Sequence, residues 1–159
     1  MILINNYLLF CRGVLGNWKV TPMKYDGHDF FSSEQLFMYL KAKLFNDEES
    51  MEKILAASTS KDAKELGRLV KGFDQEVWDS EKENLMLEAL RCKSKYSSEF
   101  KSVLLENKDK IFVECNPYDN IWSCGLSEND PRGAEPEKWR GQNLLGKCMN
   151  RLIEELINE

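Results

Sequence analysis

The stretch SSEQLFMYLKAKLF, residues 32–45, decides the helical character of the chain. Two small hydroxyl residues at its start precede apolar residues at Leu36, Leu40 and Leu44, and this is the spacing of one helix face behind an N-cap. The stretch therefore predicts a helix that begins at one of the two serines and ends near Phe45.

Five further helices are predicted downstream from apolar residues at helical spacing. The longest carries Val77, Trp78 and Leu87 between charged positions, and such charges are more typical of a solvated helix face than of a binding site. Gly72 ends the helix before it. The predicted ranges are 47–57, 60–70, 75–95, 98–106 and 142–157.

Three extended segments complete the predicted fold: 2–11, 18–25 and 111–115. The Asp26-Gly27 turn ends the second, and we expect the first two to form a small sheet at one edge. Strands followed by several helices indicate an α+β, mostly helical fold. The length of 159 residues and the hydrophobic content of 42% suit a single compact domain, residues 1–159, with one core.

The length of the apolar segments indicates the cellular compartment in which the protein is expected. No apolar run approaches the roughly 20 residues that span a bilayer. Residues 1–9 are too short, and too polar at Asn5 and Asn6, for a secretory signal. We expect a soluble, cytoplasmic protein with no membrane partner.

Five cysteines and one histidine limit the metal and nucleophile chemistry. The cysteines are widely spaced and contain no CxxC or Cys/His pair that could frame zinc, so we expect free thiols, no metal and no cofactor. A Ser-His-Asp triad is disfavoured because its base would have to be His28, which lies in the turn-like segment YDGHD. The cysteines are Cys11, Cys92, Cys115, Cys124 and Cys148.

A net charge of −5 argues against an extended electrostatic groove along a nucleic-acid backbone, because neutralising phosphates requires clustered Lys or Arg. A local basic pocket remains compatible with this charge. A substrate with one or two phosphates, or a single extruded nucleotide, therefore stays open.

Residues 116–141 form an irregular loop rich in proline and glycine, which excludes a continuous helix or a central strand. The loop also holds Trp122, Leu126 and Trp139. A long irregular loop inside a compact domain is usually functional, so we expect an active-site loop here.

Glu34 and Lys41 lie seven positions apart on the first predicted helix and so are nearly superimposed after two turns. Phe37 and Met38 share their face, so both charges are expected to be partly desolvated, which suits proton transfer or amine nucleophilicity. The alternative is an ordinary pair on a helix surface.

Two further segments bring polar and aromatic groups together. In VECNPYDNIW, residues 113–122, a strand end delivers Glu114, Tyr118, Asp119 and Trp122, where acids could protonate a leaving group and the indole could stack on a base. Alternatively, the two aromatic residues pack the loop onto the core and Asp119 makes an Asx turn.

In WRGQNLLG, residues 139–146, Arg140 and Asn143 lie at a helix start that could hold a phosphate or a ribose hydroxyl. An asparagine in that position is more often a helix cap.

These segments together resemble the NADAR family of NAD- and ADP-ribose-associated domains, which includes YbiA-like N-glycosidases. The matching stretches occur in the family's order and cover most of the chain. They are SSEQLFMYLKAKLFND (32–47), ILAASTSKDAKELGRLVKGFDQEVW (54–78), IFVECNPYDNIW (111–122) and DPRGAEPEKWRGQNLLGKCM (130–149). The resemblance implies a largely helical α+β domain with a pocket.

The resemblance also implies cleavage of an N-glycosidic bond in a phosphate-bearing ribonucleoside. Described members act on phosphoribosylamino-pyrimidine intermediates of riboflavin synthesis or on ADP-ribose attached to guanine in nucleic acid. The motifs here favour removal of ADP-ribose, with ADP-ribosylated nucleic acid as one form of the substrate. By motif, the implied catalytic residues are Glu34, Lys41 and Asp119. The implied binding residues are Trp78, Glu114, Trp122 and Asn143, and the two segments described above add Tyr118 and Arg140 as binding candidates.

The chain departs from the family pattern at CRGVLGNW (11–18), at Lys93–Ser97 and at WSCGL (122–126), where Ser123 and Cys124 alter the loop beside Trp122. This last departure motivates an alternative function, a module that binds ADP-ribose or NAD without turnover. A purely structural interaction protein is less favoured, because the loop gathers acids and aromatic residues without an obvious packing need.

Overall fold

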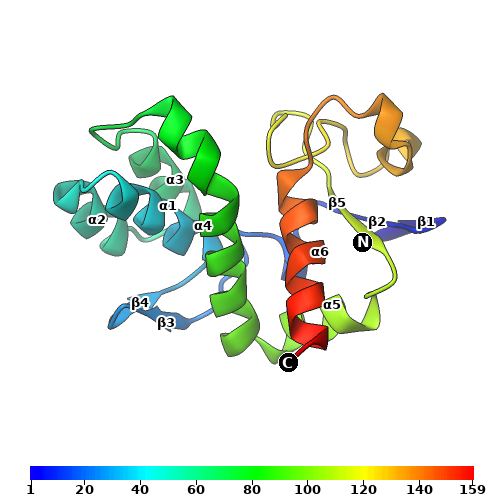
Figure 1. Cartoon of the computed structure of the whole chain (residues 1–159), viewed down its shortest axis with the longest axis horizontal. Helices are drawn as coiled ribbons and strands as arrows, with labels where there is room; N and C mark the ends of the chain where they lie inside the picture. The colour runs from blue at the N-terminus through cyan, green and yellow to red at the C-terminus, as the bar shows by residue number, and fades with distance from the viewer. The chain divides into compact units, whose positions relative to one another are not determined.

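The computed structural model describes residues 1–159, and its fold is α+β and mostly helical, as the sequence predicts. The chain divides into two compact units, shown in Figure 1. The two ends of the chain together form the first unit, which consists of residues 1–16 and 99–159. Residues 17–98 form the second. Whether residues 1–159 act as a single domain stays a prediction.

A three-stranded sheet organises the first unit. β1 (Ile2–Ile4) pairs antiparallel with β2 (Tyr7–Phe10), which pairs in parallel with β5 (Ile111–Glu114). The prediction of one strand over 2–11 was wrong, because Asn5 adopts a left-handed backbone with φ of 53° and turns the chain into a hairpin.

Helix α6 (Leu144–Ile157) packs on β5 and closes the first unit. It begins two residues later than predicted because Asn143, at φ 52°, is left-handed. The other helices of this unit are α5 (Ser98–Glu106), whose first residue belongs to the second unit, and the short 3₁₀ helices η1 (Gly13–Leu15), η2 (Pro131–Ala134) and η3 (Pro136–Lys138).

The core of the first unit is a buried cluster that joins the sheet to the irregular loop. The half-buried Trp139 packs against it, and its indole N–H donates to the carbonyl of Gly133 at 2.9 Å. The buried members of the cluster are Leu9, Val113, Cys115, Cys124 and Leu126.

A separate hairpin belongs to the second unit. β3 (Met23–Tyr25) and β4 (His28–Phe30) pair antiparallel across the Asp26-Gly27 turn, where Gly27 has φ of 76°. The expected single sheet of the two N-terminal segments was therefore wrong. The first segment pairs with β5 and the second pairs with the chain that follows it.

Helix α1 (Ser33–Leu44) is the centre of the second unit and packs against α2 (Glu48–Leu55), α3 (Ser60–Gly67) and α4 (Gln75–Tyr96). All four helices form where the sequence predicts them. Helix α3 ends at Gly67, earlier than the predicted residue 70, and its cap is Thr59.

Polar side chains tie the start of α1 to its neighbours. The hydroxyl of Ser32 caps the helix by accepting from the N–H of Gln35 at 3.2 Å, and it lies 2.8 Å from the hydroxyl of Ser60 at the start of α3. The Gln35 amide donates to the carbonyl of Ile54 at 3.0 Å and accepts from the N–H of Phe31 at 2.8 Å. These contacts fix the N-terminal turn that carries Glu34.

No helix of the structure has both the length and the hydrophobicity to span a membrane. No group of three or more His, Cys, Asp or Glu side chains is placed to hold a metal ion. All five cysteines are free, and only Cys11 is exposed.

The close packing of α6 on β5 predicts the effect of Gly146→Ala. A Cβ atom at this position would lie 2.0 Å from the backbone carbonyl of Phe112, so the helix must move away from the strand. We expect a loss of about 1 to 3 kcal/mol in the free energy of unfolding, measured by urea denaturation. The exposed neighbour Lys147→Ala should change it by less than about 0.5 kcal/mol, and equal values for both variants would contradict this packing.

Candidate functional site

The first group of predicted residues lies on α1 and α4 of the second unit. Glu34 is in the first turn of α1 and only 8% exposed, and Lys41 is half-buried near the end of the same helix. The backbone N–H of Glu34 donates to the carbonyl of Asn17 at 3.0 Å. The expected partial burial of both side chains is therefore observed, and an exposed pair on a helix surface is not.

Aromatic rings surround the Lys41 amine. Its Nζ atom lies 5.0 Å from the ring centroid of Phe73 and 5.1 Å from that of Trp78. Phe37 of α1 and Phe45, which caps the end of that helix, continue this aromatic cluster, at 5.4 Å and 6.5 Å from Trp78 between ring centroids. Helix α1 therefore supplies the amine, and α4 with the turn before it supplies the rings that cover the amine.

The environment lowers the pKa of Lys41, chiefly because burial penalises the ammonium form. The carboxylate of Glu34 acts in the opposite direction and the guanidinium of Arg68 adds to the lowering. The rings also attract the cation, but a cation–π contact contributes only about 0.5 to 1 kcal/mol where water has access. Lys41 therefore holds a larger fraction of neutral amine near neutral pH than an exposed lysine does.

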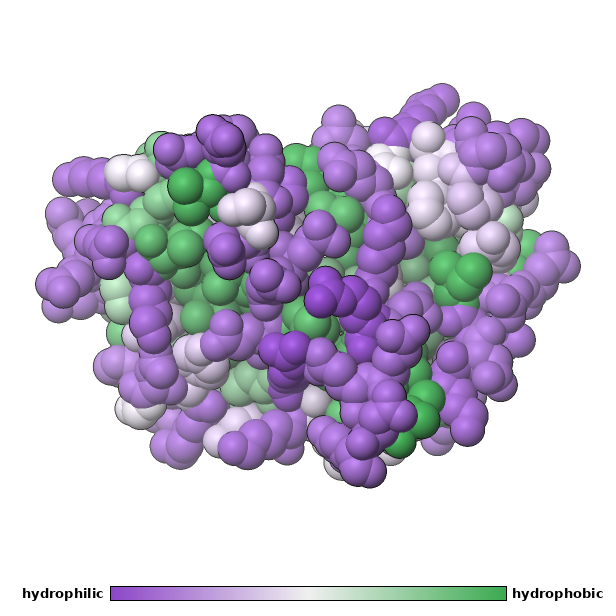
Figure 2. Space-filling view, in the orientation of Figure 1, coloured by the Kyte–Doolittle hydropathy of each residue, from purple (hydrophilic) through white to green (hydrophobic).

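Hydrophobic side chains reach the surface of the second unit. Figure 2 shows a group of them over the part that contains α1, α2 and α3, among hydrophilic residues. Leu69, Phe73 and Val77 are exposed by 71%, 41% and 40%. Phe73 thus offers part of its ring to solvent while the rest contacts the Lys41 amine and Trp78.

The second group of predicted residues lies in the first unit, on β5 and the loop that follows it. Asp119 is half-buried, and its Oδ1 accepts from the N–H groups of Ile121 and Trp122, both at 2.9 Å. This is the Asx turn that the sequence left open as an alternative. Oδ2 accepts no hydrogen bond within the chain, so one oxygen is left for a ligand.

The two aromatic residues of this loop differ in exposure. Trp122 is half-buried, whereas Tyr118 is 96% exposed and so does not pack the loop onto the core. Glu114, at the end of β5, is half-buried, and its backbone N–H donates to the side chain of Asn143.

Asn143 joins the start of α6 to β5. It is 1% exposed, its Oδ1 accepts from the N–H of Glu114 at 3.0 Å and its Nδ2 donates to the carbonyl of Phe112 at 2.9 Å. The side chain makes no capping bond to its own helix. It therefore positions the strand end, while Arg140, three residues earlier, is exposed. Binding of substrate by either residue stays a prediction.

Ser123 is the buried centre of the loop and was not recognised from the sequence as a positioning residue. Its hydroxyl accepts from the N–H groups of Asn116, at 2.7 Å, and Gly125, at 3.0 Å, and donates to the carbonyl of Asn116 at 3.0 Å. One side chain thus satisfies three backbone groups of a segment without regular structure.

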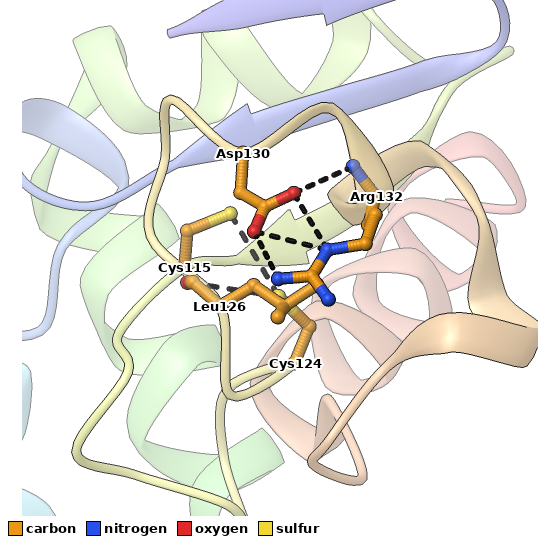
Figure 3. A network of polar contacts seen from close by, with 5 residues as sticks. All are labelled: Cys115, Cys124, Leu126, Asp130 and Arg132. Carbon is orange, nitrogen blue, oxygen red and sulfur yellow. Dashed lines mark hydrogen bonds and ion pairs between the residues drawn. The ribbon is translucent and has the colours of Figure 1, made fainter.

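Cys115 and Cys124 lie against each other beneath the loop, as Figure 3 shows. Their sulfur atoms are 3.9 Å apart, and the contact lowers the pKa of Cys124 to about 7 and raises that of Cys115. In the same view the carboxylate of Asp130 forms a bidentate ion pair with Arg132, with its shortest distance 2.6 Å. The sulfur contact joins the loop to the residue that follows β5 within the buried cluster, and the ion pair is local to the loop.

The predicted site residues therefore fall into two sets. Three of them lie in the second unit: Glu34, Lys41 and Trp78. Lys41 interacts electrostatically with Glu34, and its amine lies over the ring of Trp78. The remaining six belong to the first unit: Glu114, Tyr118, Asp119, Trp122, Arg140 and Asn143. Phe73 and Arg68 were missed, although both stand in the motif that ends at Trp78.

Comparison with known proteins identifies the family. Residues 10–157 match the NADAR domain family, and the chain belongs to it. The chain is 36% identical to the N-glycosidase R617 of Acanthamoeba polyphaga mimivirus over 80% of its own length and 75% of that protein. It is 30% identical to the N-glycosidase YbiA of Escherichia coli K12 over 92% of its length and 83% of that protein.

The fold has a solved counterpart in the same family. The NMR structure of the E. coli protein YbiA matches with a TM-score of 0.78 and 27% sequence identity, covering 99% of this chain and 88% of that one. The resemblance inferred from the motifs, and the mostly helical α+β fold, are thereby confirmed.

The burial of Lys41 predicts its titration. In protein whose lysines carry a ¹³C-dimethyl label, the Lys41 resonance should shift at lower pH than the bulk of the lysines, which titrate near pH 10.4. Lys24 is the matched control, because its hydrogen bond to Asp29 raises its pKa. Titration of Lys41 together with Lys24 would show that the rings do not desolvate the amine.

The role of Ser123 predicts that Ser123→Ala lowers the free energy of unfolding by about 1 to 3 kcal/mol, because it leaves buried backbone groups unpaired. Urea denaturation measures this loss. Ser127→Ala, at an exposed position of the same loop, should change the free energy of unfolding by less than about 0.5 kcal/mol. A Ser123→Ala protein as stable as the Ser127→Ala protein would refute the role.

Proposed function

We propose that the chain is an N-glycosidase that removes ADP-ribose from a modified guanine base. Membership of the NADAR family and the N-glycosidase names of its relatives support the reaction class. The observation that carries the proposal is the Lys41 amine, partly desolvated by Phe73 and Trp78 on the helix that also carries the buried Glu34. The guanine-linked substrate rests on the motif resemblance.

In the proposed reaction Lys41 acts as the nucleophile. Its neutral amine adds to the anomeric carbon as the bond to the base breaks, and the electron pair leaves on the base nitrogen. Glu34 supplies the proton that this nitrogen takes up. Opening of the sugar ring gives a Schiff base, which water hydrolyses to release ADP-ribose and regenerate the amine.

Burial suits both groups to these roles. A lysine becomes a nucleophile only as the neutral amine, and its lowered pKa increases that fraction. Glu34 is only 8% exposed, which limits the access of bulk water to the proton that it transfers to the departing base. Asp119 is the second candidate for the acid, although one of its oxygens is already held by the Asx turn.

The competing mechanism is direct attack by water that Glu34 or Asp119 orients, with Lys41 holding a substrate phosphate. Lys41→Ala and Lys41→Arg separate the two. If the amine is the nucleophile, both variants lose at least about 100-fold in turnover, because arginine keeps the charge but forms no Schiff base. Both should unfold within about 1 kcal/mol of the parent chain.

The assay uses ADP-ribosylated guanine oligonucleotide, with free ADP-ribose measured by mass spectrometry. Borohydride added during turnover should leave a reduced adduct on Lys41 of the parent chain, because only a Schiff base is reducible. Full activity of Lys41→Arg without any adduct would exclude the covalent route and favour the phosphate-holding role.

The same assay distinguishes two alternative functions. Turnover of a phosphoribosylamino-pyrimidine in place of the oligonucleotide would assign the chain to riboflavin intermediates. Binding of ADP-ribose without turnover of either substrate would make it a binding module, an outcome that the altered WSCGL segment (122–126) motivates.

A further inference from the structure

Tyr118 is a large aromatic side chain that the fold leaves almost wholly in water. It is 96% exposed, so its ring gains almost nothing from burial in this chain. Every other tyrosine is less exposed, and the next is Tyr96 at 42%. An aromatic ring kept at the surface is available to a ligand.

The backbone beneath Tyr118 is held firmly, although it has no regular structure. The N–H of Tyr118 donates to the side chain of Asn116 at 2.9 Å, and the Asx turn of Asp119 fixes the residues that follow. Ser123 closes the base of the loop on Asn116. The ring is thus presented from an ordered loop, and little backbone entropy is lost when a ligand binds it.

A second segment braces the same loop and adds positive charge. Gln142 donates to the carbonyl of Asn120 at 2.9 Å, and Leu144 donates to that of Ile121 at 3.1 Å. Arg140 and Lys147, on either side of these bonds, are exposed and form no ion pair, unlike Arg132 and Lys138. The exposed ring therefore stands on a scaffold with two available cations.

These features fit single-stranded nucleic acid better than a protein partner. A protein interface needs several hundred Å² of contiguous surface around the ring. Beside Tyr118 the loop exposes only the small ring of Pro117 and, three residues on, the 38% exposed Ile121, with the polar Asp119 and Asn120 between them. Stacking on one base needs no more than one flat ring, and it tolerates any base because every base has a π face.

We propose that Tyr118 is a stacking platform for an unmodified base of a single-stranded polynucleotide substrate. This rests on the proposed function and on the nucleic-acid substrate that the family resemblance implies, and it adds a contact between Tyr118 and the strand beside the modified guanine. With a net charge of −5 and two available cations, stacking contributes more to this contact than phosphate neutralisation does.

The test compares hydrolysis of two substrates with the same linkage, an ADP-ribosylated guanine in a short single-stranded oligonucleotide and the ADP-ribosylated mononucleoside. For Tyr118→Ala the ratio of kcat/KM, oligonucleotide over mononucleoside, should fall about 5- to 150-fold, as expected for a stack of about 1 to 3 kcal/mol. Tyr118→Phe keeps the ring and should keep the ratio. Ile121→Ala removes an exposed aliphatic side chain of the same loop and should also keep it.

Fluorescence anisotropy with an unmodified labelled oligonucleotide tests the platform independently of turnover. Tyr118→Ala should weaken this binding by a similar factor and Tyr118→Phe should not. An unchanged ratio together with unchanged anisotropy would overturn the inference. If the parent chain hydrolyses neither substrate, the proposed function fails, and the anisotropy alone still decides whether Tyr118 is a nucleic-acid platform.

Discussion

The partial removal of one amine from water is the constraint on which the second unit depends. Keeping Lys41 among rings requires α1 to be buried along most of its length, and α1 is buried because α2, α3 and α4 all pack on it. Burial of a cation costs free energy unless something offsets it. The Glu34 carboxylate and the faces of Phe73 and Trp78 offset part of that cost, so the packing of this unit and the proposed chemistry share the same residues.

The first unit contains a long loop with no strand and no α-helix, and only two short 3₁₀ helices. A few buried polar side chains order this loop by hydrogen bonding to its backbone groups and to those of the adjoining strand. Ser123 binds three backbone groups and Asn143 binds two. Gly141 permits the close approach, because a Cβ atom there would lie 2.3 Å from the carbonyl of Ser123. Ser123, one of the two residues at which this loop departs from the family pattern, is thus a residue that holds the loop together.

The helices were the most predictable part of the fold. Local signals settle them: the serine before α1, the aspartate before α2 and the apolar spacing of α4 all act within a few residues. Strand pairing was less predictable. The partner of β2 is β5, about a hundred residues further along the chain, and no local pattern specifies it. The hairpin turn at Asn5 was also not predictable, because the left-handed conformation is only one of those open to asparagine.

The geometry of the candidate site was predictable where spacing on one helix fixes it, as for Glu34 and Lys41. Phe73 and Arg68 escaped because they precede α4 or follow α3, in a turn whose path depends on tertiary packing. Asn143 was expected at a helix start, but whether it would face a ligand or the strand depended on β5.

The loop around Tyr118 has an evolutionary consequence. Its shape is fixed by Asn116, Asp119 and Ser123, none of which needs any particular side chain at position 118. Because the Tyr118 side chain hardly contacts the rest of the chain, replacing it costs the protein little stability. Lineages can therefore exchange this one side chain while the fold beneath it stays the same. Under the proposed stacking role, such an exchange would let relatives with one scaffold diverge in the targets they serve.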